Sequence, residues 1–309
     1  MVDPELLTRV AAIGLVAARR ILELGARGSA AHMKADGSPV TRADLAAHRI
    51  LVERLGADGW AVVSEEGDAI APAAHEPYFL VDPLDGTREY IAGHPHYTVN
   101  LALIEDHQPT LGVIVVPARG SLYLALNPRA GKAAAAWRID LADQLGAPDR
   151  PLAGRRTHTS EDLEGWISIL KDAHWQSIRC SSVEADQHPD GVEARRWRAL
   201  ASASHLDART SAWLAQHGVS HLERYGSALK FCVLAEGGAE VYPRLAPTME
   251  WDTAAGQAIV EAAGGSVCLP DGSPMRYGKT GWRNGDFVAW GNRDPIAREP
   301  AYNRLRTAS

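Results

Sequence analysis

The sequence of 309 residues predicts a mixed α/β fold, because helical and strand-like patterns alternate along it without internal repeats. An amphipathic helix is expected over 4–24, since apolar residues recur there at helical spacing and Asp3-Pro4 supplies an N-cap and a first-turn proline. A second helical pattern follows Asp44 and closes near Gly56. The third observation is a series of short apolar runs of strand character at 60–64, 78–81, 97–104 and 111–116.

The order of these elements also predicts a division of the chain. The last two runs, joined by 105–109, are expected to pair as antiparallel strands. Between about 137 and 197 the pattern weakens, and order returns with strands and helices at 198–202, 206–217, 227–236, 239–242, 251–263 and 266–269. We therefore expect an N-terminal α+β lobe (1–135), an insertion or interlobe segment (136–197) and a C-terminal α/β lobe (198–309).

Composition excludes several classes of protein. A net charge of −6 and the absence of any Lys or Arg run argue against nucleic-acid binding. Charged residues such as Arg9, Arg19 and Glu23 interrupt the first apolar segment, so no signal peptide and no membrane span are expected. The three cysteines show no CxxC spacing, which indicates neither a disulfide framework nor a zinc site. We expect a cytoplasmic protein; peripheral association with the inner membrane and the oligomeric state stay open.

The most informative motif is the apolar strand 78–81, which runs directly into Asp82-Pro-Leu-Asp-Gly-Thr87. Pro83 fixes its own φ and Gly86 permits a sharp turn, so Asp82, Asp85 and Thr87 can converge at the end of the strand. Two carboxylates held this close repel one another unless a cation lies between them, and hard oxygen ligands favour Mg²⁺ or Mn²⁺ over zinc. A simple polar turn is the alternative interpretation of the same residues.

Further carboxylates occupy comparable positions. Glu65 and Glu66 follow the apolar run 60–63, so two strands end in acidic clusters, which favours a shared metal edge over a solvated loop. Asp44 follows Thr41 at the spacing of a capping box, and its carboxylate then serves the backbone. Asp252 lies at the head of an Ala-rich helix, where it either complements the helix dipole or faces a metal.

These motifs together carry a resemblance. Asp82-Pro-Leu-Asp-Gly-Thr87 with Trp251-Asp-Thr-Ala-Ala-Gly256 resembles the two signatures of the inositol-monophosphatase superfamily of Li⁺-sensitive, metal-dependent phosphatases. Gly226-Ser-Ala-Leu-Lys-Phe231 and Val241-Tyr-Pro-Arg244 resemble its CysQ-type 3′(2′),5′-bisphosphate nucleotidases. The resemblance implies a layered α/β/α/β/α sandwich with the metals at the junction of its two lobes.

The resemblance also implies residue roles. Two or three Mg²⁺ ions, with Mn²⁺ possible in their place, would be held by Glu65, Asp82, the Leu84 carbonyl, Asp85 and Asp252. Asp44 and Thr87, with Glu65, would act on the attacking water. The substrate would contact Gly86, Thr87, His205, Ser227, Lys230 and Arg244. Plainer readings stay open for four of these: a helix N-cap for Ser227, surface charges for Lys230 and Arg244, and a loop histidine for His205.

The implied reaction is hydrolysis of the 3′-phosphate of adenosine 3′,5′-bisphosphate to AMP and phosphate. Two departures from the family pattern leave the identity of the substrate open. Ala203 stands where these nucleotidases usually carry Arg, and the stretch 138–197 is longer than in the family. Inositol monophosphate or fructose 1,6-bisphosphate is the alternative substrate, and a non-catalytic nucleotide sensor is the alternative to an enzyme.

Overall fold

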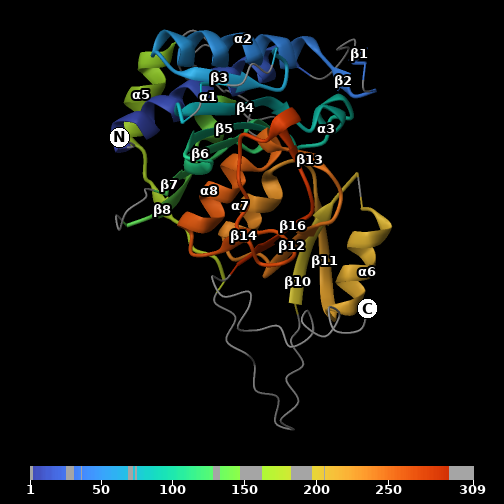
Figure 1. Cartoon of the computed structure of the whole chain (residues 1–309). Coiled ribbons are helices and arrows are strands. Elements are labelled where there is room, and N and C mark those ends of the chain that lie inside the picture. Colours follow the sequence, from blue (N-terminus) through green and yellow to red (C-terminus); the bar gives the residue numbers. More distant parts are fainter. Residues whose placement is uncertain are drawn as a thin grey trace.

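The structure is a computed structural model that describes residues 3–25, 31–35, 37–68, 72–73, 75–127, 133–146, 162–181, 197–204 and 206–291. Over these residues two β-sheets alternate with three layers of helices, in the order helices, sheet, helices, sheet, helix (Figure 1). This arrangement confirms both the mixed α/β class and the layered α/β/α/β/α sandwich.

The first sheet has the strand order β3-β4-β5-β6-β7-β8-β9. β3 and β4 are parallel, and every later neighbour is antiparallel. The strands are β3 (Ala61–Ser64), β4 (Tyr78–Asp85), β5 (Thr98–Glu105), β6 (Gln108–Val116), β7 (Ser121–Leu126), β8 (Ala135–Asp140) and β9 (Gln176–Ser177). The antiparallel pairing expected for the runs 97–104 and 111–116 is confirmed.

Both faces of this sheet are buried, because successive side chains of a strand point to opposite faces. Phe79 and Val81 belong to the core formed with α1 (Pro4–Leu24), α2 (Arg42–Ala57) and α5 (Leu163–Asp172). Leu80 lies in the core on the opposite face, formed with α7 (Leu229–Ala235) and α8 (Ala254–Ala262). The helices predicted at the N-terminus are confirmed, including the Asp3 cap, which accepts a hydrogen bond from the Leu6 N–H at 2.9 Å.

Glycine allows the central helices to pack closely. A Cβ atom on Gly112 of β6 would lie 2.7 Å from the Ala255 carbonyl oxygen of α8, and one on Gly256 would lie 2.3 Å from the Phe231 ring. These distances are shorter than a carbon atom tolerates. The α7–α8 layer therefore lies directly on the sheet, and its N-terminal ends reach the edge where β3 and β4 end.

The second sheet has the order β11-β10-β12-β16-β14, with β16 antiparallel to both its neighbours. Its strands are β10 (Trp197–Ser202), β11 (Val219–Tyr225), β12 (Val241–Arg244), β14 (Ser266–Cys268) and β16 (Phe287–Trp290). Trp213 and Leu214 of α6 (Ala208–Gln216) cover its outer face.

Short elements complete the described chain. They are β1 (His32–Met33), β2 (Pro39–Val40), β13 (Thr248–Met249), β15 (Arg283–Asn284), α3 (Thr87–Ile91), α4 (Ala142–Leu145) and the 3-10 turns Pro117–Arg119, Glu250–Asp252 and Thr280–Trp282.

Several boundaries differ from expectation. The helix expected over 251–263 begins at Ala254, because Glu250–Asp252 forms a separate 3-10 turn. The pattern of 136–197 is weak, yet its described residues supply β8, β9 and α5 to the first lobe. Trp166 of α5 is fully buried against that lobe. The expected boundary at residue 135 coincides with the start of β8, and the division into lobes stays a prediction.

Candidate active site

The acidic motif at the end of β4 contains a β-bulge. Asp82 pairs with Asn100 of β5 and Asp85 pairs with Thr98, so β4 holds one residue more than its partner over this stretch. Without the extra residue, Asp82 and Asp85 would point to opposite faces, because they are three positions apart. The bulge places both carboxylates on the face toward the second lobe. Gly86 then turns the chain with φ of 90°, and a Cβ atom there would lie 3.0 Å from the His96 carbonyl oxygen.

Glu65 reaches the same edge because β3 is parallel to β4. Ser64 pairs with Val81, so Glu65 emerges beside Asp82, and its N–H donates to the Val81 carbonyl at 3.2 Å. Lys34 Nζ lies 2.9 Å from Glu65 Oε1 and 2.6 Å from Glu66 Oε1. Burial raises the pKa of Glu66 to about 6. The acidic ends of two neighbouring strands thus meet, as the sequence predicted.

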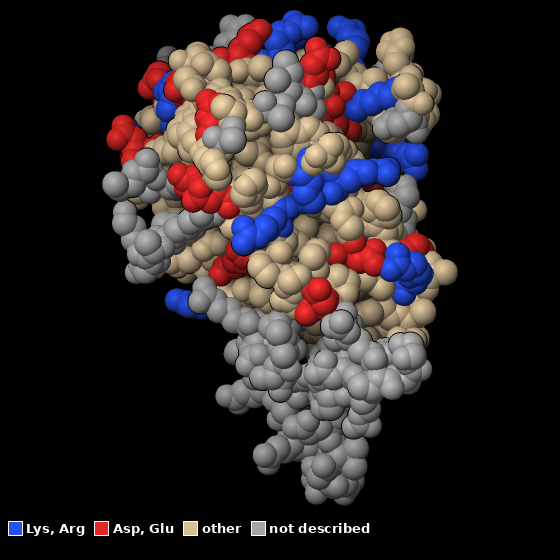
Figure 2. Space-filling view, viewed as in Figure 1, with Lys and Arg blue, Asp and Glu red and all other residues tan. Residues whose placement is uncertain are grey.

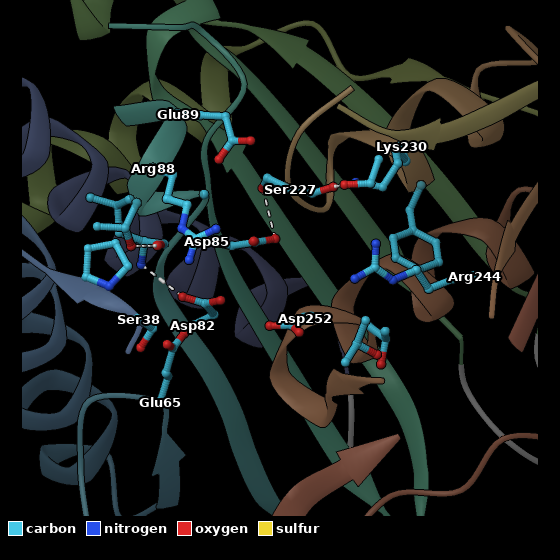
Figure 3. Close-up of a pocket in the computed structure, with 18 of the residues that line it drawn as sticks. Ser38, Glu65, Asp82, Asp85, Arg88, Glu89, Ser227, Lys230, Arg244 and Asp252 are labelled. Carbon is cyan, nitrogen blue, oxygen red and sulfur yellow. Dashed lines mark hydrogen bonds between the residues drawn. The ribbon is translucent and has the colours of Figure 1, made fainter. Parts of the chain in front are cut away.

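Asp252 approaches from the second lobe. Carboxylate oxygens of Glu65, Asp82 and Asp252 lie within 4.8 Å of one another, and the three side chains converge in Figure 3. One oxygen of Asp252 accepts a hydrogen bond from the Met249 N–H at 2.8 Å. The ends of β3 and β4 and the turn before α8 therefore form a single acidic cluster.

Asp85 lies next to this cluster but is not one of its three members. Its Oδ2 accepts hydrogen bonds from Ser227 Oγ at 2.9 Å, the Ala228 N–H at 2.7 Å and Asn100 Nδ2 at 3.2 Å. Ser227 adopts a positive φ of 58°, a conformation that costs energy for a non-glycine residue. Ser227 was expected to contact substrate; the structure gives its hydroxyl to Asp85 and to Thr98 Oγ1.

Asp44 carries out the role of a helix cap and contacts the predicted catalytic hydroxyl at the same time. Its Oδ2 accepts from the Thr41 N–H at 2.8 Å, which completes the capping box at the start of α2. Its Oδ1 accepts from Thr87 Oγ1 at 2.8 Å, while the Leu84 carbonyl lies 3.2 Å from the same hydroxyl. The capping interpretation of Asp44 is therefore confirmed, and its other oxygen contacts Thr87, while a role toward the attacking water stays a prediction.

The electrostatics of the cluster favour a cation. Burial and the neighbouring carboxylates raise the pKa of Asp82 and of Asp252 well above their usual range. Burial also raises the pKa of Asp85, against the opposing effect of Lys230. Buried like charges at this separation are costly unless they are protonated or bind a positive ion. A cluster of carboxylate oxygens fits a hard divalent cation, so the donor set agrees with a metal site.

Two cationic side chains face the acidic cluster from the second lobe. Lys230 is 4% exposed, donates to the carbonyl oxygens of Tyr225 and Ser227, and lies 5.3 Å from the centre of the Tyr242 ring. It is therefore buried and is not a surface charge. Burial lowers the pKa of Lys230 to about 8. The Arg244 guanidinium extends toward the space above Asp252 (Figure 3).

The three carboxylates of the cluster, Asp85, Ser227, Lys230 and Arg244 border one pocket of about 310 Å³. Its wall includes Gly86, Leu84, Thr87 and the charged groups just described; Asp44 lies behind Thr87, and His205 lies outside the described residues. The pocket wall also contains residues that the sequence motifs did not indicate: Ser38, Arg88, Glu89, Ser202, Tyr242 and Thr248. Arg88 and Glu89 follow Thr87 directly in the sequence, and this position next to the acidic motif could have indicated that they border the pocket.

Comparison with known proteins agrees with this fold and site. The profile of the Inositol monophosphatase family matches residues 5–299. The chain belongs to this family.

The chain is also similar to individual proteins and solved structures of this family. The chain is 35% identical over 248 residues to the 3′(2′),5′-bisphosphate nucleotidase CysQ of Escherichia coli K12, which covers 79% of this chain and 81% of that protein. The crystal structure of CysQ from Bacteroides thetaiotaomicron is similar with a TM-score of 0.69 and 31% identity, covering 94% of this chain and 98% of the other. An inositol monophosphatase from Anabaena shares the fold. Its structure matches with a TM-score of 0.64 and 19% identity, covering 98% of this chain and 95% of the other.

A membrane-spanning helix is not found. Among the residues that the structure describes, none of the helices combines the length and the apolar character needed to cross a bilayer.

Proposed function

We propose that this protein is a Mg²⁺-dependent 3′(2′),5′-bisphosphate nucleotidase that hydrolyses adenosine 3′,5′-bisphosphate to AMP and phosphate. The observation that carries the proposal is the pocket itself, which has an acidic cluster on one wall and two cationic side chains on the other. A substrate with two phosphates can use both walls at once, whereas inositol monophosphate offers a phosphate to only one. The names of the CysQ relatives support the same activity.

The metal would be held by Glu65, Asp82 and Asp252, with Asp85 and the Leu84 carbonyl at the adjacent position. When bound, Mg²⁺ supplies positive charge to the phosphate and lowers the pKa of a bound water. The number of ions is part of the proposal: two or three are expected, and the five groups just named are the predicted ligands.

Thr87 and Asp44 would orient the attacking water. The Thr87 hydroxyl has one proton, and its shorter contact is with Asp44 Oδ1 at 2.8 Å. Because that proton is donated to Asp44, the Thr87 oxygen is free to accept a hydrogen bond from the attacking water. This hydrogen bond turns a lone pair of the water oxygen toward phosphorus. The new bond joins the water oxygen to phosphorus while the bond to the ribose 3′ oxygen breaks. The attacking water gives up one proton and the ribose oxygen takes one up, so the products are phosphate and AMP with a free 3′ hydroxyl.

Lys230 and Arg244 would bind the phosphate that is not hydrolysed. Two of the three Lys230 N–H groups are given to backbone carbonyls, which fixes the ammonium group and leaves a third for an anion. The planar guanidinium of Arg244 suits bidentate contact with phosphate oxygens.

The surface charge agrees with a small-molecule substrate. On the face shown in Figure 2, a band of Lys and Arg side chains crosses the molecule between acidic groups, so both signs are interspersed. The net charge of the chain is −6. Binding along a nucleic-acid backbone relies on a broad surface of positive charge, which this face does not offer.

Phosphate release tests the proposal. We expect release from adenosine 3′,5′-bisphosphate with Mg²⁺ and none with EDTA, and a kcat/KM for this substrate above the values for inositol monophosphate and fructose 1,6-bisphosphate. Equal or higher kcat/KM for either sugar phosphate would transfer the assignment to that substrate. Nucleotide binding without release under any metal would indicate a sensor.

A further inference from the structure

A segment of the second lobe connects the acidic cluster to the first sheet. This segment, residues 275–284, is here called the strap. It contacts the turn between β5 and β6, where the Tyr277 N–H donates to the His107 carbonyl at 3.1 Å and His107 Nδ1 lies 2.7 Å from the Tyr277 carbonyl. Gln108 Nε2 donates to the Met275 carbonyl at 2.8 Å. The start of the strap is thus fastened to the lobe that supplies Glu65 and Asp82.

The middle of the strap binds a fully buried carboxylate. Glu250, with 0% exposure, accepts from the Gly278 N–H at 2.7 Å and from the Lys279 N–H at 3.0 Å, and Lys279 Nζ lies 2.6 Å from it. A buried carboxylate with three donors has a fixed orientation. Gly278 has a φ of 85°, and a Cβ atom there would lie 3.2 Å from Tyr78 Oη, so glycine is the residue that lets this N–H reach Glu250.

The end of the strap holds the same turn from its other side. Asn284, 4% exposed, donates through Nδ2 to the Met249 carbonyl at 2.9 Å and to Thr253 Oγ1 at 2.8 Å. These two partners bracket Asp252 in the sequence. The Met249 N–H in turn donates to the Asp252 carboxylate at 2.8 Å.

We propose that Glu250 and Asn284 are positioning residues that set the distance of Asp252 from Glu65 and Asp82, and thereby the affinity of the metal site. This inference rests on the proposed function, because it assumes that the three carboxylates hold a metal. The 3-10 turn that carries Asp252 is only three residues long, and Glu250 and Asn284 attach it to the strap, which His107 in turn connects to the first sheet. Groups that orient metal ligands without touching the metal commonly change its affinity by about 10- to 100-fold.

Direct metal binding separates this role from general stability. Mn²⁺ binding is measured by electron paramagnetic resonance on the full chain without substrate, together with the Mg²⁺ concentration that gives half-maximal phosphate release. We expect Glu250→Gln and Asn284→Ala to weaken Mn²⁺ binding and to raise the half-saturating Mg²⁺ concentration by about 10- to 100-fold. At saturating Mg²⁺, kcat and the KM for substrate should recover to within a few-fold of wild type.

Glu240→Gln is the matched control. Glu240 is also a largely buried carboxylate. It accepts a hydrogen bond from the Arg198 N–H at 2.7 Å and pairs with the Arg198 guanidinium at 2.5 Å. Unlike Asp252, it does not border the pocket. It should lose stability with Mn²⁺ affinity unchanged. Lys279→Ala removes only the more exposed partner of Glu250 and should give a smaller shift in the same direction, which keeps the test available if the other variants do not fold.

The outcomes distinguish the two levels of inference. Mn²⁺ binding by wild type with equal binding by the folded strap variants would overturn the positioning role and leave the proposed function intact. A wild-type chain that binds no Mn²⁺ would overturn the metal-dependent function and the inference with it.

Discussion

The two oxygens of Asp44 make different contacts, so its role as a helix cap does not exclude the role predicted for it beside Thr87. A carboxylate has two oxygens, and here one completes the capping box with Thr41 while the other contacts Thr87. Ser227 donates to Asp85 and also borders the pocket, so its predicted contact with substrate stays a prediction. The residue types at the site were predictable from local chemistry, but their partners depend on contacts between distant segments.

Replacement of Asp44 tests its second role. We expect Asp44→Asn to lower kcat by about 10²–10³, the range for a lost preorganised hydrogen-bonding group, and to cost about 1 kcal/mol of stability or less. Thr41→Ala is the control, because it removes the capping hydroxyl but not the contact with Thr87. It should cost about 1 kcal/mol with kcat retained. Steady-state kinetics and urea denaturation measure both; equal kcat in the two variants would reduce Asp44 to a cap.

Arg244→Ala tests the second phosphate site. The variant should raise the KM for adenosine 3′,5′-bisphosphate by about tenfold or more, while the KM for inositol monophosphate changes little, because a uniform binding interaction is lost. Arg209→Ala, which removes an exposed guanidinium paired with Asp286, is the control and should change neither value. Equal losses on both substrates would contradict the assignment of Arg244 to the second phosphate.

The pH dependence of substrate binding should follow Lys230. Burial lowers the pKa of this ammonium group to about 8, so it is charged below pH 8 and neutral above it. An anion loses its attraction as the charge disappears, so the KM for the bisphosphate should rise between pH 7.5 and 9, by up to about tenfold per pH unit above the pKa. Lys230→Met should have a high KM that is flat over this interval. An unchanged wild-type KM across it would exclude a binding role for the Lys230 charge.

At the scale of elements, the first sheet was predictable where its strands are long and apolar. The strand pair β5 and β6 and the acidic ends of β3 and β4 follow from local sequence alone. β16 was missed because four residues carry little periodic signal, although it lies inside the second sheet and pairs with β12 and β14. β11 was missed because it is an edge strand in which Ser, His, Glu and Arg interrupt the apolar pattern. β8 was missed because most of it lies in the charged, weakly patterned stretch after 136. The bulge in β4 is fixed by its pairing with β5, which local sequence does not reveal.

The helix α5 gives an element-scale prediction. Trp166 is fully buried between α5 and the N-terminal core, so Trp166→Ala should cost about 3–5 kcal/mol of stability through the cavity that it leaves. Trp175→Ala, at a partly buried position of the same segment, should cost less. Both variants should keep the wild-type kcat below their melting temperatures, because neither residue borders the pocket. A Trp166→Ala variant of full stability would mean that α5 is peripheral to this lobe.

At the scale of the whole molecule, the acidic cluster joins the end of the first sheet to the turn before α8, the two parts that are predicted to belong to separate lobes. Glu65 and Asp82 come from the first sheet, and Asp252 comes from the turn before α8. A ligand that binds only the folded protein stabilises it by mass action. A cation held between the lobes should therefore stabilise the complete fold and not one part of it.

Thermal unfolding measures this coupling. Mg²⁺ at about 100 times its dissociation constant should stabilise the protein by about 2.7 kcal/mol and raise its melting temperature in a single transition. Asp82→Asn should abolish the increase, while Glu240→Gln should retain it from a lower starting temperature. A rise confined to one of two separable transitions would show that the metal binds within a single lobe.

The origin of the cluster in both lobes also has a consequence for the protein during its own synthesis. Glu65 and Asp82 lie in the first third of the chain and Asp252 in the last third, and the strap that holds Asp252 follows later still. A ribosome-bound chain that has folded only its first sheet carries two of the three carboxylates and neither Lys230 nor Arg244. Such a chain has no complete site, so the ability to hydrolyse nucleotides arises only in the last stage of translation, when the second lobe docks. Activity then requires a chain in which the first sheet and the turn before α8 have both been made and have come together.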